Sequence, residues 1–324
     1  MKNGKKSFIL IEVILAALVI VLSFVMVRGR SGKDFDKISV IIENSDDNQW
    51  SALKYGIKMA AKDQGVEVFF SSTAGDFTAG KLKNTIENEL NNGADAIIVQ
   101  PVSAPGIEKL LKKMEKKIPI MLVENNVEEN KDSCVFSVTQ ADNYAMGIAL
   151  AEELLKDYSG NIEGKTLGII SKSEHSEAAR NRELGFKDGI KRTGARVGWS
   201  VSDFSGKEKE NFLANQSKVN IVIALDDDSL TTAGEYAASN NFHGAFVYGI
   251  GNSTEAIHYL DIGILECLLV PDEFSVGYQS LTEISKRLKC YFYKMQSKMV
   301  SYDIIRREEL FSKENQEILF TMSQ

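Results

Sequence analysis

The fold of this protein is decided by the stretch Ile38-Ser-Val-Ile-Ile-Glu-Asn-Ser-Asp-Asp-Asn-Gln-Trp50-Ser-Ala-Leu-Lys-Tyr-Gly56. It begins with a nearly continuous apolar run, which is typical of a parallel β-strand that is covered on both faces. A polar loop follows, and a helical pattern starts at the aromatic residue Trp50. Because open parallel sheets bind ligands beyond the carboxyl ends of their strands, this loop is the first candidate for a binding segment.

Runs of the same kind recur along the chain and alternate with helical patterns. The further strand candidates are residues 66–70, 96–99, 118–123 and 135–138 in a first series, and 166–170, 196–201, 221–225, 245–248 and 264–269 in a second. Two consecutive series of strand–helix units predict an α/β protein with two doubly wound parallel-sheet lobes. A long helix, 274–293, and one more strand, 302–305, follow the second series. We therefore expect the chain to cross between the lobes several times and to form a hinge there.

The expected lobes are each built from two parts of the chain. The N-terminal lobe comprises residues 37–140 and about 272–300. The C-terminal lobe comprises residues 141–271 and about 301–324. A ligand held between two such lobes can be enclosed by closure of the hinge.

The segment before the lobes has a different character. Residues 7–27 are apolar except for Glu12, and a helix of about 20 residues spans a bilayer core. Three lysines precede this run, which favours a cytoplasmic N-terminus at residues 1–6. The alternative is a cleaved signal peptide, but the run is long for one and no small-residue cleavage site closes it. We expect one uncleaved transmembrane signal anchor, a linker at residues 28–36, and lobes on the extracytoplasmic side of the cell membrane.

The composition and the motifs exclude several classes of function. With 324 residues and a formal net charge of −7, the chain lacks the basic surface that a nucleic-acid partner requires. It contains no phosphate-binding loop, no complete dinucleotide fingerprint and no G-x-S-x-G nucleophile motif. Neither the histidines (His175, His243 and His258) nor the three cysteines have the spacing of metal ligands. We expect no enzyme activity, no cofactor and no metal.

The strand ends carry polar and aromatic side chains instead. In chain order they are Glu43, Asp47, Gln49 and Trp50; Gln100; Glu124 and Asn125; Ser173, Glu174 and His175, with Arg180 and Arg182 in the next helix; Asp203 and Phe204; and Asp226, Asp227 and Asp228. Planar amide, carboxylate and guanidinium groups bind sugar hydroxyls in a fixed plane, and aromatic faces cover the C–H side of a sugar ring. The set as a whole predicts a site for a small polyhydroxylated ligand.

Most of these residues also have a purely structural interpretation. Trp50 could be a core residue at a helix start, and the carboxylate of Glu43 could accept hydrogen bonds from nearby helix N-termini. Arg182 could pair with Asp188 or Glu177 on its own helix. Asp226–Asp228 could cap the following helix, with Asp228 the foremost candidate. The functional interpretation therefore depends on the set, since several strand ends present groups of the same type.

Six motifs occur in a family-like order. They are Trp50-Ser-Ala-Leu-Lys-Tyr-Gly56, Ala94-Asp-Ala-Ile-Ile-Val-Gln-Pro101, Ile118-Pro-Ile-Met-Leu-Val-Glu124, Ala141-Asp-Asn-Tyr-Ala-Met-Gly147, Ala178-Ala-Arg-Asn-Arg-Glu-Leu-Gly-Phe186 and Pro271-Asp-Glu-Phe-Ser-Val-Gly277. Over about residues 37–320 the chain resembles periplasmic sugar-binding proteins of the ribose-binding type, class I solute-binding proteins related to the ligand domain of lactose repressors. A membrane segment stands where the repressors carry their DNA-binding helices, so repression is excluded.

The resemblance implies a periplasmic-binding-protein-like type I fold and a set of ligand contacts. Carried over position by position, these contacts are Glu43, Asp47, Gln49, Trp50, Gln100, Glu124, Asn125, Arg182, Phe204 and Asp226. The chain departs from the ribose binders at Asn125, where they have Arg, at Gly251, where they have Asp, and at Pro271, where they have Gln. It also gains the acids Glu43 and Asp47. A hydroxyl-rich ligand remains the expectation, and the excess of acid suggests an amino-bearing sugar or another cationic small molecule.

The resemblance implies a membrane-anchored solute-binding protein that delivers a sugar to an ABC importer. The alternative is a sensory receptor of the same fold that signals to a membrane histidine kinase or chemoreceptor. A structural envelope protein with a degenerate pocket is a third possibility. Permease and ATPase genes beside this gene would favour transport, whereas a two-component pair would favour sensing.

Overall fold

The computed structural model describes residues 11–23, 35–43, 50–73, 78–101, 104–127, 136–171, 176–202 and 213–320. The chain forms two compact units, Met1–Asp36 and Lys37–Gln324. In the first unit, residues 11–23 are helical. Within the described ranges, no helix combines the length and the hydropathy that crossing a membrane requires. The expected membrane segment, residues 7–27, extends beyond those ranges on both sides and stays a prediction.

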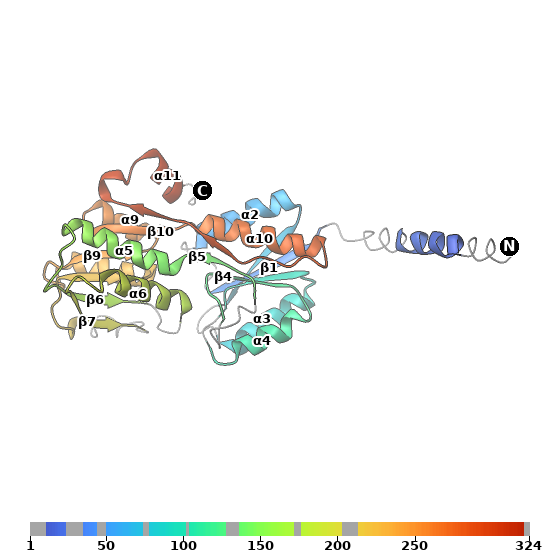
Figure 1. The fold of residues 1–324 in the computed structure, drawn as a ribbon, viewed down its shortest axis with the longest axis horizontal. Coiled ribbons are helices and arrows are strands. Elements are labelled where there is room, and N and C mark those ends of the chain that lie inside the picture. Colours follow the sequence, from blue (N-terminus) through green and yellow to red (C-terminus); the bar gives the residue numbers. More distant parts are fainter. Residues whose placement is uncertain are drawn as a thin grey trace. The chain divides into compact units, whose positions relative to one another are not determined.

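The second unit contains two six-stranded sheets, and the first has the order β11-β5-β4-β3-β1-β2. Its strands are β1 (Lys37–Glu43), β2 (Glu67–Thr73), β3 (Ala96–Val99), β4 (Ile120–Val123), β5 (Val138–Ala141) and β11 (Lys298–Val300), and every described pairing among them is parallel. Figure 1 shows α2 (Ser51–Gln64) and α10 (Glu273–Lys289) over one face and α3 (Ala79–Asn91) and α4 (Ile107–Glu115) over the other. This lobe is therefore doubly wound.

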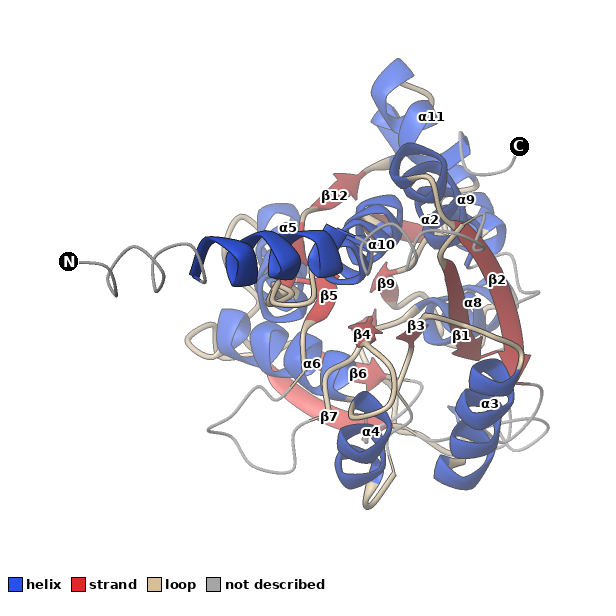
Figure 2. Ribbon diagram, turned by 90° about the vertical axis from the view of Figure 1, so that its right-hand side faces the viewer, coloured by secondary structure: helices blue, strands red, loops and turns tan. Residues whose placement is uncertain are grey.

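The second sheet repeats the same order, β12-β10-β9-β8-β6-β7. Its strands are β6 (Thr166–Ile170), β7 (Arg196–Val201), β8 (Ile221–Ala224), β9 (Phe246–Ile250), β10 (Leu265–Pro271) and β12 (Tyr302–Ile305). The helices α5 (Asn143–Asp157) and α6 (Glu177–Ile190) lie on one face, and α8 (Asp227–Ala238) and α9 (Thr254–Asp261) lie on the other (Figure 2). The chain finishes with a 3-10 turn, η2 (Arg307–Glu309), and α11 (Lys313–Phe320).

Local signals set the ends of several elements. The hydroxyl groups of Ser176 and Ser253 cap α6 and α9 by accepting the backbone N–H of the third residue of each helix. Gly65 ends α2 in the left-handed conformation, with φ 67°, which glycine adopts without a Cβ clash. The central strands β3, β4 and β8 are four-residue apolar runs that are buried throughout, as expected for strands covered on both faces.

Four features differ from the sequence-based expectation. Strand β5 lies at 138–141 rather than 135–138, because its buried Thr139 and Gln140 interrupt the apolar pattern. Strand β11 was not predicted, since it is a three-residue edge strand whose Met299 is exposed. Strand β12 pairs antiparallel with β10, so the second sheet is mixed rather than parallel. Helix α10 ends at Lys289 instead of continuing to residue 293.

The chain passes from one sheet to the other three times. It leaves β5 for α5 at residues 141–143, returns from β10 to α10 at 271–273, and passes from β11 to β12 at 300–302. Two of these crossings are tied together, because the backbone N–H of Asp272 donates to the carbonyl of Ser301 over 3.1 Å. Crossings that lie this close together suit a hinge, because few backbone torsions have to change.

One apolar cluster runs through both lobes on the side of these crossings. It includes Val40 and Ile98 from the first sheet and Ile169 and Ile223 from the second. The other two clusters stay within one lobe each. Every buried residue in these clusters lies at or beyond position 38, so residues 37–324 contain all the described core that they need to fold.

Two helix pairs pack through reciprocal glycine contacts. On α2 and α10, a Cβ at Gly56 would lie 2.1 Å from the carbonyl oxygen of Phe274, and a Cβ at Gly277 would lie 2.1 Å from that of Leu53. On α5 and α6, a Cβ at Gly147 would lie 2.1 Å from the carbonyl oxygen of Arg182. The fourth glycine, Gly185, faces the carbonyl of Tyr144 at the same 2.1 Å. Each pair of helices therefore approaches backbone to backbone, which any side chain would prevent.

We predict that Gly185→Ala lowers the free energy of unfolding by about 2–3 kcal/mol, because its methyl group has no room against the α5 backbone. Gly80→Ala in α3 is the matched control, since a Cβ there meets nothing nearer than 3.9 Å. It should raise the free energy of unfolding by about 0.5–1 kcal/mol through the unfolded state. Urea unfolding of both variants measures the difference, and equal effects would contradict the packing argument.

Candidate ligand-binding site at the lobe boundary

The strand ends of the first lobe are tied together around Glu43. Its backbone N–H donates to Oε1 of Gln100 over 3.1 Å, and its carbonyl accepts the indole N–H of Trp50 over 2.8 Å. Trp50 belongs to the core, with 8% of its surface exposed. Its indole thus secures the start of α2, as the structural interpretation of this residue expected. A ligand contact by its remaining exposed edge stays a prediction.

Glu124, directly after β4, has an unusual backbone. Its φ of 68° places it in the left-handed region, where a residue with a Cβ costs about 1 kcal/mol. Non-glycine residues in that region cluster at functional sites. The residue is partly exposed, but its Oε1 atom is fully buried. Glu124 therefore combines backbone strain with a buried carboxylate oxygen at a strand end.

Asn125, the next residue, joins the two lobes. Its Oδ1 accepts a hydrogen bond from the hydroxyl of Ser176 over 2.9 Å and from the backbone N–H of Ala178 over 3.3 Å. The backbone N–H of Asn126 donates to Oε2 of Glu177 over 3.2 Å. The strand end of β4 thus meets the N-terminus of α6, so the position that carries Arg in the ribose binders here serves as a contact between lobes.

Arg182 is buried on α6 in the second lobe. Its Nε donates to Oδ1 of Asn143 over 2.7 Å, and its Nη1 donates to the carbonyl of Leu225 over 2.9 Å. The two acids considered as its partners bond elsewhere: Asp188 accepts from Tyr144, and Glu177 accepts from Asn181. Arg182 is thus fixed against the start of α5 and the end of β8, beside the lobe boundary.

Glu124 faces a second acid, Glu273, in the first turn of α10. Burial raises the pKa of both carboxyl groups. The negative charge of Glu124 and a hydrogen bond to it raise the pKa of Glu273 further, whereas the same hydrogen bond and the positive charge of Arg182 lower that of Glu124. Two ionised carboxylates that are buried side by side repel each other and cannot form a hydrogen bond, because neither has a hydrogen to donate. A proton held between the carboxyl groups of Glu273 and Glu124 removes this conflict.

Asp226 and Asp227 serve the second lobe differently. Oδ1 of Asp226 accepts the backbone N–H of Ser229 over 2.9 Å, so Asp226 caps α8 and the expectation that Asp228 is foremost in this role was wrong. Oδ1 of Asp227 accepts the backbone N–H groups of Asn252 and Ser253 over 2.8 and 2.9 Å. A Cβ at Gly251 would lie only 2.3 Å from that same oxygen. The absence of an aspartate at 251 is explained, because the carboxylate of Asp227 occupies the space.

Seven of the ten predicted contacts can thus be placed. Asp47, Gln49 and Phe204 lie outside the described residues. Glu124, Asn125 and Arg182 gather at the lobe boundary, Glu43, Gln100 and Trp50 form one bonded group at the end of β1, and Asp226 caps α8. Two polar residues of this region were missed, Asn143 and Glu273, since both stand at helix starts where Asn and Glu are ordinary.

We predict that Glu273→Gln raises thermal stability at neutral pH. A raised folded-state pKa stabilises the fold below the usual value of 4.5, and this contribution is lost as the pH rises through the raised value. The amide keeps a donor for Glu124 and does not ionise, so the melting temperature of the variant should fall less between pH 5 and pH 8.

Glu283→Gln on the same helix is the control, and we expect it to change the melting temperature at neutral pH in the opposite direction. Burial raises the pKa of Glu283, but hydrogen bonds from Lys286, the backbone N–H of Gln296 and Tyr293 outweigh it and lower the pKa. Its stabilisation is therefore present above 4.5 and is lost as the pH falls. Glu283→Gln should lower the melting temperature at neutral pH. A Glu273→Gln variant that melts below the wild type there would refute the shared proton.

The comparisons with known proteins agree with this architecture. A family profile described as "periplasmic binding protein domain" matches residues 38–289. The galactofuranose-binding protein YtfQ of Escherichia coli (strain K12) is 29% identical over 153 residues, which are 44% of this chain and 47% of that protein. The aligned part thus spans about half the length of this curated relative.

Solved structures of similar fold extend over most of the chain. A carbohydrate transporter solute-binding protein from Agrobacterium radiobacter, in complex with D-arabinose, superimposes with a TM-score of 0.77 at 19% identity, covering 89% of this chain and 100% of that one. The XylFII-LytSN complex matches with a TM-score of 0.71 at 16% identity, covering 85% and 98%. At these identities the structures show the fold alone. The family profile over residues 38–289 shows that the chain belongs to the periplasmic binding protein domain family.

Proposed function

We propose that this protein is an extracytoplasmic solute-binding protein that captures a sugar or a similar small polar ligand between its two lobes for an ABC importer. The observation that carries the proposal is the meeting of Glu124, Asn125 and Arg182, from opposite lobes, beside the three crossings. Charged groups are costly to bury unless they have partners. The buried Oε1 atom of Glu124 has no hydrogen-bond partner among the described residues, and a polar ligand would supply one when the lobes close around it.

Closure of the hinge is the whole proposed mechanism. The bonds from Ser176 and Ala178 to Asn125 join the lobes at the end of β4, and the three crossings can absorb a rotation of one lobe against the other. A ligand that contacts both lobes stabilises the closed form by mass action. No bond is made or broken in this mechanism, so we expect no catalysis and no cofactor.

The chemistry of the boundary favours a ligand that donates hydrogen bonds. The carboxyl oxygens of Glu124 and Glu273 can accept hydrogen bonds, and the guanidinium of Arg182 can donate them. This pattern suits a sugar, and it also suits an amino-bearing sugar, since an ammonium group would be paired by the acids. The ligands named for similar proteins, galactofuranose and D-arabinose, belong to the first class.

A sensory receptor is the second candidate function. One similar fold was solved as the XylFII-LytSN complex, a structure that is named for two components. A binder held by a transmembrane helix would be suited to hand its closed state to a membrane histidine kinase or chemoreceptor. Crosslinking in native membranes with and without sugar separates the two functions. A protein that serves an importer would be crosslinked to a permease, whereas a sensory receptor would be crosslinked to a kinase or chemoreceptor.

We also propose that residues 7–27 anchor the protein in the cell membrane, with the lobes outside. The full chain should then stay in the membrane pellet after washing with high salt and alkaline carbonate. A chain consisting of residues 37–324 should be released by the same washes, because an apolar span of about 20 residues is what resists extraction. Release of the full chain would contradict the anchor, and an intact mass that lacks these residues would favour the signal peptide.

We predict that residues 37–324 bind a sugar or an amino sugar from a panel in titration calorimetry and melt at a higher temperature with it. Arg182→Lys keeps the charge but loses the planar fork, so affinity should fall about tenfold. Arg196→Gln, at the exposed start of β7, is the control and should bind as the wild type does. A panel without any binder would favour the degenerate-pocket alternative.

A further inference from the structure

The amino ends of the strands of the first sheet form a surface at the opposite end of β4 from Glu124 and Asn125. A hollow of about 440 Å³ opens there between the end of α4, the start of β4 and the end of α10. Its lining residues are Glu115, Lys116, Lys117, Ile118, Pro119, Arg287, Leu288, Tyr291 and Met295. We call this hollow and the adjoining Phe292 the basal face.

The basal face is locally cationic in an acidic protein. Three cations, Lys116, Lys117 and Arg287, line the hollow against one acid, Glu115, whereas the whole chain has a net charge of −7. Burial raises the pKa of Glu115, and the positive charge of Arg287 opposes this rise, so this acid offsets only part of the three positive charges. A hollow of this kind suits an anionic group such as a phosphate.

Two aromatic side chains project beside these cations. Tyr291 is 77% exposed and Phe292 is 91% exposed. The guanidinium of Arg287 lies 4.6 Å from the centre of the Tyr291 ring, and the two rings meet edge to face at 5.4 Å. Large aromatic side chains next to basic residues are characteristic of surfaces that contact the interfacial region of a bilayer.

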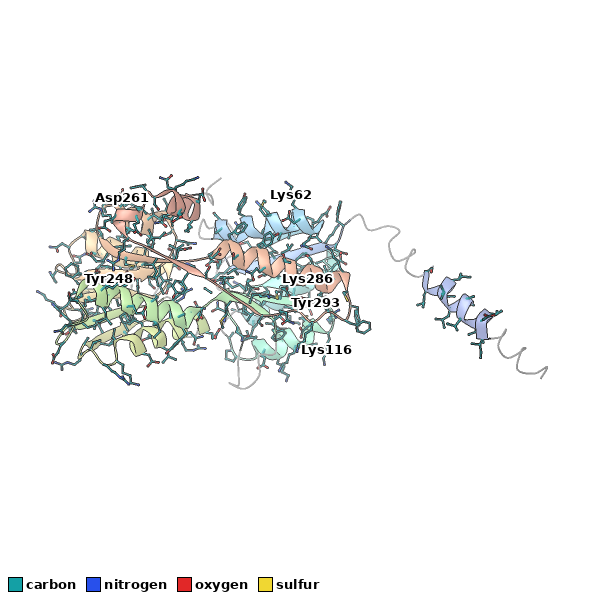
Figure 3. All side chains as sticks on the ribbon, turned by 45° about the horizontal axis from the view of Figure 1, so that its top comes forward. Lys62, Lys116, Tyr248, Asp261, Lys286 and Tyr293 are labelled. Carbon is teal, nitrogen blue, oxygen red and sulfur yellow. The ribbon has the colours of Figure 1, made fainter. Side chains whose placement is uncertain are left out.

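The turn that carries these rings is held in place. Glu283 of α10 accepts hydrogen bonds from Lys286, from the hydroxyl of Tyr293 and from the backbone N–H of Gln296, at 2.8, 2.8 and 2.9 Å. Figure 3 shows Lys286 and Tyr293 close together at the end of α10. The exposed rings therefore belong to a braced turn rather than to a loose loop, so their exposure is built into the fold.

The chain enters the second unit at the same edge of the sheet. Lys37 and Asp95 are joined there by backbone and side-chain hydrogen bonds, and Pro119 accepts the backbone N–H of Ile97. Lys37 thus lies two strands from Pro119 at the rim of the hollow, about 10 Å away. The linker at residues 28–36 spans about 30 Å at most. An anchor at residues 7–27 would therefore keep Lys37 within that reach of the bilayer.

We propose that the basal face docks on the anionic phospholipid surface of the membrane, with Lys116, Lys117 and Arg287 against headgroup phosphates and Tyr291 and Phe292 in the interfacial layer. The partner is the lipid surface, and the docking would hold the lobe boundary away from the bilayer, open to ligand. The proposal rests on the extracytoplasmic, anchored location proposed above.

The test uses residues 37–324, whose described core is complete without the anchor. This protein should sediment with vesicles of phosphatidylcholine and phosphatidylglycerol, but not with phosphatidylcholine alone, and salt should release it. Two variants should each bind the anionic vesicles with an affinity that is lower by about tenfold or more: Lys116→Gln/Lys117→Gln/Arg287→Gln and Tyr291→Ser/Phe292→Ser. Glycerol phosphate in solution should not displace the protein, because it offers the same phosphate without a surface.

Matched controls come from the second lobe. Lys191→Gln/Arg192→Gln/Lys313→Gln removes the same charge from exposed positions, and Phe311→Ser removes a ring that is 60% exposed. Both should bind vesicles as the wild type does. A fluorophore on the exposed Cys290, in a Cys134→Ser background, should shift to the blue on anionic vesicles. Failure to bind them, or equal loss in the controls, overturns the docking, and sugar binding by the same protein would show that the proposed function survives.

Discussion

The rest of the structure depends on the direct backbone contact within two helix pairs. Glycines at 56 and 277 press α2 against α10, and glycines at 147 and 185 press α5 against α6. The helices α5 and α10 begin at two of the three crossings, with Asp142 and Asp272 as their caps. Because the pairs are close-packed, the positions of the helix starts follow from the glycines. The polar groups at the lobe boundary, Arg182 of α6 included, inherit their geometry from this packing.

That geometry gives the boundary its electrostatic character. Helix α10 brings Glu273 to Glu124, and the α5–α6 pair brings Arg182 to Asn143. Burial then forces the two acids to share one proton, while Arg182 favours the charged form of both. Glu124 holds a left-handed backbone conformation that nothing in its own sequence favours. Backbone strain and a buried carboxylate oxygen at one place are consistent with a site that a ligand completes.

Much of the fold could be predicted because its signals are local. Apolar runs such as Thr166–Ile170 marked strands, and Ser176 and Ser253 marked helix starts. The failures came where partners far along the chain decide the outcome. Strand β5 contains polar residues but is buried by its neighbours. Strand β11 is defined by its pairing with β5, which lies far away in the sequence. Among the candidate site residues, Glu124 and Asn125 were singled out from their place after a strand and Arg182 from its place in the next helix. Glu273 was not singled out, since its role depends on an acid that lies far away in sequence.

The sequence by itself determined the two-lobe α/β architecture, the strand ends that carry polar groups, and the departures at Asn125, Gly251 and Pro271. The first two follow from periodicity and residue type, which are properties of short segments, whereas the departures follow from the resemblance to the ribose binders. Only the tertiary structure decided that Asn125 joins the lobes, that Asp227 fills the space beside Gly251, and that Glu273 shares a proton with Glu124. Each of these involves two groups that lie apart in the sequence and that the fold brings together. Such pairings cannot be inferred from any single stretch of sequence.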